Sequence, residues 1–248
     1  MASDRGRDAL PERSGGPGSA DGGDAGASPT VDRRTVAALH RRVLSELAAA
    51  GDWWDGVSRR AIMEEARRAR RCVRCLEQRA PSGPFSGGHD GSGVLPAAAV
   101  EVIHRVVNDS GRLTRQWAGL QIEELGDASY AEVVGVTATV VAMDVYARSM
   151  GDPPRELLPP VAGPPVAERP DDVGDVGAWI PMTEEKLLAN VSRALSLVPR
   201  TNATWRILVN ESYSRGPRML DLTWDRALTR PQVELIAAEI SMLQECFY

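Results

Sequence analysis

The sequence predicts an all-α protein, and three observations lead to this class. Apolar residues recur with the 3.6-residue period of a helix in several long segments. No segment shows the sustained alternation of apolar and polar residues, flanked by turn pairs, that is typical of strands. Two helical patterns, Glu132–Tyr146 and Glu234–Tyr248, align at an offset of 102 residues. Although any two apolar helices align to some degree, the paired glutamates and tyrosines favour two related helical repeats.

The composition divides the chain into four parts. The first is rich in Gly, Ser, Pro and Asp and contains little to bury, so it is expected to be disordered. A later Pro/Gly-rich stretch predicts a linker between two helical repeats. The predicted parts are a disordered tail (1–30), a first repeat (31–151), the linker (152–182) and a second repeat (183–248).

Helices are predicted most clearly in three places. The segment Val57–Leu76 follows the helical period apart from one glutamate, Glu65. The segment Tyr130–Met150 is a single apolar helix that ends at a glycine. The last helix has a start signal, because Thr229 can cap it and Gln232 follows three residues later, as a capping box requires.

Composition and charge exclude several classes of protein. The 248 residues are 43% hydrophobic and 25% charged, and the longest apolar runs are too short to span a bilayer. A net charge of −5 offers no extended positive surface, so neither nucleic acid nor a membrane is an expected partner. The N-terminal segment lacks the apolar stretch of a secretory signal, and three cysteines are too few for a secreted disulfide framework. We therefore expect a cytoplasmic protein.

Cys72 and Cys75 stand three residues apart in the arginine-rich stretch RRARRCVRCLEQR. On a helix they would share one face and lie close enough to form a disulfide or half of a metal site. Neighbouring positive charge stabilises a thiolate, so one of the two is expected to have a lowered pKa and to be nucleophilic near neutral pH. The arginine run Arg67–Arg74 is otherwise most simply a solvated helix face.

Three interpretations of this pair remain open: a redox-active dithiol, structural cysteines on a partly buried helix, and a metal site. A closed tetrahedral zinc site needs four ligands, and no second Cys or His pair has suitable spacing. Only His89, in a glycine-rich loop, and His104, in an apolar run, could contribute. His104 is more simply explained as a hydrogen-bonded core histidine. No metal ligand and no cofactor is therefore predicted.

A second thiol pattern lies near the end of the sequence, where Glu234 precedes Cys246 by twelve residues. On a straight helix this separation is about 18 Å along the axis, too far for direct proton transfer. The spacing, together with RALSLVP at Arg193–Pro199 and the final LTRPQVELIAAEISMLQECFY, resembles the alkylhydroperoxidase AhpD-like family, in its peroxidase-related branch. The family is also called carboxymuconolactone decarboxylase-like.

The resemblance implies an all-helical bundle with a redox motif of the form Glu-x11-Cys-x-x-Cys-x3-His. Glu234 then corresponds to the proton-relay glutamate and Cys246 to the first, resolving cysteine. The second, peroxidatic cysteine and the histidine would fall after Tyr248. The resemblance further implies a hydroperoxide substrate, a dithiol reductant and a homo-oligomer.

We expect the motif to continue after Tyr248 with a selenocysteine. Its UGA codon is ordinarily read as a stop, and a selenol is more acidic and more nucleophilic than a thiol, which suits the peroxidatic position. A truncated chain or a degenerate gene is the alternative, and the nucleotide sequence after the Tyr248 codon distinguishes them.

The predicted function is a thiol-dependent peroxidase that reduces organic hydroperoxides or hydrogen peroxide and is impaired in this 248-residue form. The candidate catalytic residues are Cys246, Glu234, Cys72 and Cys75. Two alternatives remain. One is a non-redox carboxymuconolactone decarboxylase-like enzyme, which would need a base and no cysteine pair. The other is a catalytically inactive redox sensor or binding partner.

Overall fold

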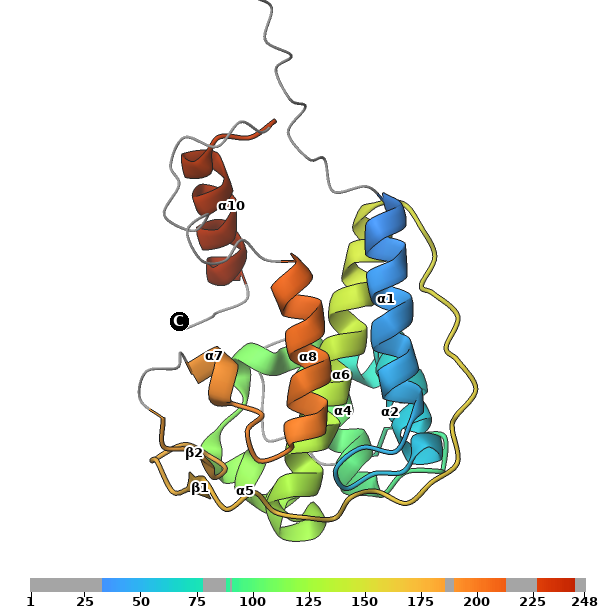
Figure 1. Cartoon of the computed structure of the whole chain (residues 1–248), viewed down its shortest axis with the longest axis vertical. Helices are drawn as coiled ribbons and strands as arrows, with labels where there is room; N and C mark the ends of the chain where they lie inside the picture. The colour runs from blue at the N-terminus through green and yellow to red at the C-terminus, as the bar shows by residue number, and fades with distance from the viewer. Residues whose placement is uncertain (1–32, 78–87, 90, 186–189, 213–226, 244–248) are drawn as a thin grey trace, which may run out of the picture. The chain divides into compact units, whose positions relative to one another are not determined.

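A computed structural model describes residues 33–77, 88–89, 91–185, 190–212 and 227–243, and over these ranges the protein is all-α, as predicted (Figure 1). The regular β-structure in these ranges is one short antiparallel pair, β1 (Val173–Gly174) and β2 (Met182–Thr183). The helices are α1 (Arg33–Ala48), α2 (Gly56–Ala69), α3 (Val73–Glu77), α4 (Ala97–Asp109), η1 (Ser110–Arg112), α5 (Arg115–Leu125), α6 (Asp127–Ser149), α7 (Asn190–Arg193), α8 (Pro199–Ser212) and α10 (Arg230–Leu243).

The central helix is α6, which contacts α2, α4, α5 and α8. Val133, Val136 and Val140 on it are fully buried. Because neighbouring helices cover several of its sides, α6 is apolar around most of its circumference rather than along one stripe. By length and composition alone it could cross a membrane, a test that a buried core helix also passes, and 67% of its apolar window is buried inside the bundle.

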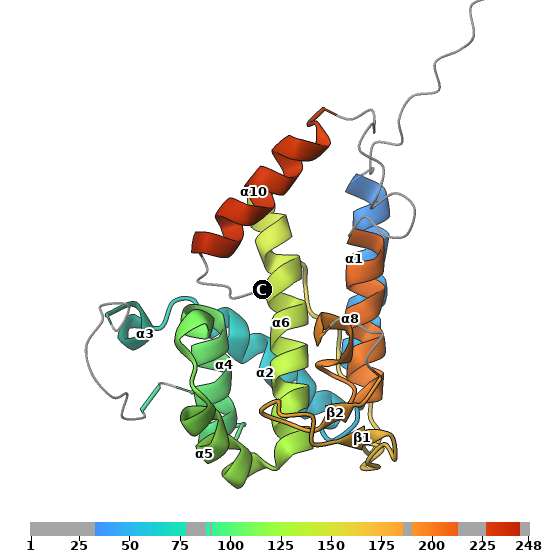
Figure 2. The same ribbon diagram turned by 90° about the vertical axis from the view of Figure 1, so that its left-hand side faces the viewer.

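Helices from both sides of the predicted linker share one hydrophobic core. α8 packs against α1 and α6, and the three helices run side by side in both views (Figures 1 and 2). Leu208 of α8 belongs to the same buried cluster as Val43 and Leu47 of α1. The residues after the Pro/Gly-rich segment therefore complete the core that α1 and α6 begin.

The Pro/Gly-rich segment itself lies against the bundle. Between Asp152 and Pro170 it contains neither helix nor strand. The Val161 N–H donates to the carbonyl of Ala48 at the end of α1, 2.8 Å away. Leu157 is buried in the main core. Backbone hydrogen bonds and one buried side chain thus attach this segment to the helices.

Two of the clearly predicted helices are confirmed. α6 covers the predicted Tyr130–Met150 to within a few residues. At the start of α10 the Thr229 N–H donates to Gln232 Oε1 over 2.8 Å, which is the backward bond of a capping box. Both signals depend on residues close together in the sequence, so they needed no tertiary contact to be recognised.

The single helical pattern predicted over Val57–Leu76 is wrong, because the structure interrupts it. α2 ends at Ala69 and α3 begins at Val73. The Cys72 N–H donates to the Ala69 carbonyl three residues back, and this tighter bond ends the helical i→i−4 pattern. Cys72 therefore precedes α3 and does not lie on one continuous helix with Cys75.

Candidate metal centre

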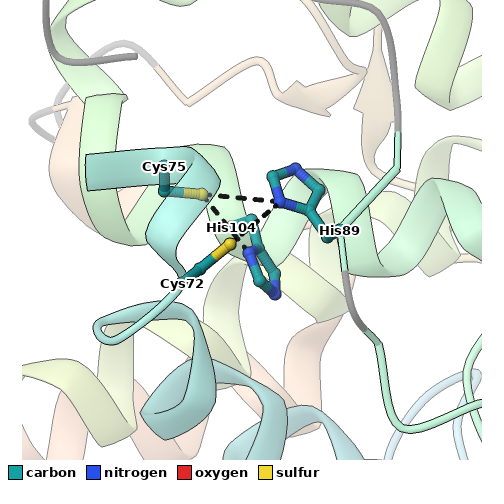
Figure 3. A group of neighbouring side chains, drawn as sticks. All are labelled: Cys72, Cys75, His89 and His104. Carbon is teal, nitrogen blue, oxygen red and sulfur yellow. Dashed lines mark hydrogen bonds between the residues drawn. The ribbon is translucent and has the colours of Figure 1, made fainter. Parts of the chain in front are cut away.

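Four side chains from separate elements converge just beyond the end of α2 (Figure 3). Cys72 precedes α3, Cys75 lies within α3, His89 lies before α4, and His104 lies within α4. The Nδ1 atom of His89 is 3.6 Å from Cys72 Sγ and 3.5 Å from Cys75 Sγ. The Nδ1 atom of His104 is 3.4 Å from Cys75 Sγ. One ligand atom from each residue lies within 4.8 Å of all the others.

A carboxylate holds each imidazole from its far side. His104 Nε2 lies 2.8 Å from Glu65 Oε1, and His89 Nε2 lies 3.0 Å from Glu101 Oε2. An ionised carboxylate only accepts hydrogen bonds, so a neutral imidazole here carries its proton on Nε2. Its Nδ1 lone pair then faces the thiols. The Trp117 indole N–H in turn donates to Glu101 Oε1 over 3.1 Å, which fixes that carboxylate.

The four residues differ in their access to solvent. Cys75 and His104 are buried, and the His89 side chain is only 2% exposed. The two imidazole rings lie with their centroids 3.9 Å apart. Cys72 is half-buried. Solvent therefore reaches the cluster most readily at Cys72.

The two thiols have different acidities. Burial raises the pKa of Cys72, but hydrogen bonds with His89 and Cys75 outweigh it and lower that pKa below its ordinary value. Burial, with the hydrogen bond and charge of Cys72, raises the pKa of Cys75 to about 12. Of the pair, Cys72 is the more acidic, and His89 rather than the nearby arginines is the main favourable cause.

The two imidazoles also differ. Burial lowers the pKa of His104, and its hydrogen bond with Glu65 only partly offsets this. For His89 burial acts in the same direction, but hydrogen bonds with Glu101 and Cys72 overcome it and raise the pKa. His104 therefore favours the neutral form, in which its Nδ1 lone pair can serve as a ligand.

Of the two C-terminal candidates, Glu234 is not part of this centre, and Cys246 lies outside the residues that the structure describes. Glu234 lies on α10 with its side chain 57% exposed, and it forms an ion pair with Arg230 one turn earlier. This is the ordinary contact of a helix surface.

Sequence reasoning identified both cysteines and named His89 and His104 as the residues that could contribute further ligands, but it did not predict that the histidines converge on the cysteines. The conclusion that a fourfold ligand set was incomplete is incorrect, because His89 and His104 converge without being a closely spaced pair. Glu65 and Glu101 were missed as their partners. One signal was present: Glu65 interrupts an apolar pattern, and a buried carboxylate requires a partner.

Comparison of the chain with protein-family models, curated proteins and solved structures gives no match. The class of the protein therefore follows from its own fold and centre: an all-α protein with a largely buried cluster of two cysteines and two histidines.

Proposed function

We propose that Cys72, Cys75, His89 and His104 bind one Zn²⁺ ion and that the ion holds this end of the bundle together. The spacing of the ligand atoms carries the proposal. Zn–S bonds of about 2.3 Å and Zn–N bonds of about 2.0–2.1 Å at tetrahedral angles place sulfur and nitrogen about 3.5 Å apart. The three S···N contacts here measure 3.4, 3.5 and 3.6 Å.

The ligand types, and the carboxylates hydrogen-bonded to the two histidines, agree with zinc. Two sulfur and two nitrogen ligands in a tetrahedral arrangement are typical of Zn²⁺. Glu65 and Glu101 supply the outer hydrogen bonds that orient metal-binding imidazoles and increase their basicity. Four protein ligands leave no open coordination position, so the proposed role is structural rather than catalytic.

The short helix α3 explains why a metal is useful at this place. It has five residues, and of these only Cys75 is buried. Val73 and Leu76 are 67% and 46% exposed, so apolar burial contributes little to holding the helix. A helix of this length is not stable by itself. Zinc bound to Cys72 and Cys75 attaches it to α4 through His104.

Metal analysis of the purified protein tests the proposal, with about one zinc per chain expected. Cobalt substitution should give the absorption of a tetrahedral thiolate site. Cys75→Ser and His104→Ala should each lose the metal. The matched control is His40→Ala, which removes a buried histidine of α1 outside the cluster and should leave the metal bound. Full zinc content in Cys75→Ser would overturn the proposal.

A second candidate function is the thiol-dependent peroxidase, supported by the resemblance to the AhpD-like family and by one contact pattern. Each thiol touches a histidine that is backed by a carboxylate, and a Cys–His–Glu relay is what this chemistry uses. In the metal-free protein the Cys72 thiolate attacks a hydroperoxide, and with one proton it yields Cys72–SOH and an alcohol. The Cys75 thiol then condenses with Cys72–SOH to give a disulfide and water, and an external dithiol reduces the disulfide.

Zinc and hydroperoxide compete for the same sulfur lone pairs, so one assay separates the two candidates. Peroxide consumption is measured with a dithiol reductant, on zinc-loaded and on chelated protein. A peroxidase built on this cluster turns over after chelation and loses turnover in Cys72→Ser, which removes the attacking thiolate. Loss of turnover in Cys246→Ser instead would assign the activity to the C-terminal motif. No consumption in any form would leave the decarboxylase-like and inactive-partner alternatives.

A further inference from the structure

A cavity of about 510 Å³ lies beside the centre, where the end of α2 meets α3. Cys72 and His104 form part of its wall, so the cavity reaches two of the four proposed zinc ligands. The remaining wall is strongly basic, with four arginines and a single carboxylate, Glu64. A cavity of this size is within the range that holds small-molecule ligands.

Two of the arginines are held in place by the protein. Arg67 donates from Nε and Nη2 to the two oxygens of Asp144, each over 2.9 Å, and from Nη2 to the Arg155 carbonyl over 2.8 Å. Arg74 donates from Nη1 to the Gly88 carbonyl over 3.0 Å. These bonds orient two guanidinium groups at the cavity wall before a ligand binds, which lowers the entropy cost of binding.

The other two arginines are more exposed. The Arg68 side chain is 55% exposed and lies 3.6 Å from Glu65. Arg71 is exposed and forms no ion pair with any carboxylate among the residues that the structure describes. The carboxylate of Glu64 already pairs with Arg60 over 2.8 Å. Asp144 already compensates the charge of Arg67, so the positive charge at this cavity comes mainly from Arg68, Arg71 and Arg74, in a protein whose net charge is −5.

We infer that this cavity binds a small organic anion, with its phosphate or carboxylate group on the arginines and its body against Cys72. The planar guanidinium fork matches both anionic groups with paired hydrogen bonds. The inference goes beyond the zinc and peroxidase proposals, since neither assigns a ligand to these arginines.

Calorimetric titration of the 248-residue protein tests the inference at fixed ionic strength, with inorganic phosphate in one arm and succinate in the other. Saturable binding is expected in at least one arm, and the stronger arm identifies the anionic group. Arg71→Gln and Arg68→Gln should each weaken binding roughly 10- to 100-fold, as expected from losing one charge-assisted hydrogen bond. Both side chains are exposed, so both variants should fold, which circular dichroism checks.

The matched control is Arg41→Gln, which removes an exposed arginine from α1 outside the cavity and should change the Kd by less than about twofold. A bound anion should also slow alkylation of Cys72 by iodoacetamide, a neutral reagent. If Arg41→Gln and Arg71→Gln weaken anion binding equally, the binding reflects general charge attraction and not this cavity. That result, or no saturation by about 10 mM of either probe, overturns the inference.

Discussion

Two clusters of buried polar groups in this protein differ in how their hydrogen-bonding groups are satisfied. The first surrounds Glu132 of α6, whose side chain is fully buried. Its carboxylate accepts hydrogen bonds from the backbone N–H groups of Asp52, Trp53 and Trp54 and pairs with Arg59 at 3.4 Å. The Glu132 carboxylate thus finds its partners in the chain itself, whereas Arg59 Nε and Nη2 are buried without a hydrogen bond among the described residues.

Asp52 extends this first cluster to α8. Its carboxylate accepts from the backbone N–H groups of Arg200 and Thr201, at 3.0 and 2.9 Å, and so caps a helix that begins far along the chain. The position before it must be glycine, because a Cβ on Gly51 would lie 1.8 Å from Glu132 Oε1. The cluster therefore joins the α1–α2 connection, α6 and α8.

The second cluster, formed by the two cysteines and two histidines, is arranged in the opposite way. Glu65 and Glu101 accept hydrogen bonds from the imidazole Nε2–H groups, so in the neutral imidazoles the Nδ1 lone pairs face the sulfur atoms. Groups that all offer lone pairs are satisfied together by a cation. The difference teaches that backbone N–H groups and Arg59 satisfy the buried carboxylate of the first cluster, whereas the second cluster is proposed to need zinc.

The largest expected effect is on the first cluster, around Glu132. Glu132→Ala leaves Arg59 buried without its carboxylate and leaves three backbone N–H groups without their acceptor. The free energy of unfolding should fall by about 3–5 kcal/mol. Urea unfolding with and without a chelator measures it, and the loss should be the same in both. A loss below about 1 kcal/mol would show that the cluster does not stabilise the fold.

Removal of zinc should have the next largest effect. If zinc is present at about 100 times its Kd, a chelator should lower the free energy of unfolding by about 2.7 kcal/mol. Hydrogen exchange should then increase in α3, which buries only Cys75. Unchanged stability and unchanged exchange after chelation would remove the contrast between the two clusters.

A smaller effect is expected from the carboxylates behind the histidines. Glu101→Gln replaces an acceptor-only group by an amide that holds His89 less firmly, so zinc affinity should fall roughly 10- to 100-fold. Competition with a chromogenic chelator measures the affinity. Glu123→Gln, in α5, is the control because that glutamate has no bond to either histidine in the described contacts. Equal zinc affinities for the two variants would show that Glu101 does not contribute to zinc binding.

The smallest effect is expected at Glu234, which aligns with Glu132 in the proposed repeat. Its ion pair with Arg230 is at the surface, and such pairs contribute about 0–1 kcal/mol. Glu234→Gln should therefore change the free energy of unfolding by less than about 0.5 kcal/mol. A change as large as that of Glu132→Ala would mean that the two helices have equivalent environments.

The candidate site could be predicted only in part, for a physical reason. Cys72 and Cys75 are recognisable because three residues separate them. His89 and His104 reach them only after α3, α4 and the segment between them pack together. Glu101 can be recognised as part of the site only when its hydrogen-bond partner, the imidazole of His89, is known. Long-range convergence of this kind depends on the packing of helices, which helical periodicity does not specify.

The sequence by itself determined the helical class, the extent of α6 and the capping box of α10, because each depends on residues within a few turns of one another. Only the tertiary structure decided which of two similar helices is buried. Glu132 and Glu234 occupy matching positions in similar apolar patterns, yet one is enclosed and the other is 57% exposed. A pattern shows which residues can be buried, whereas the surrounding helices decide whether they are.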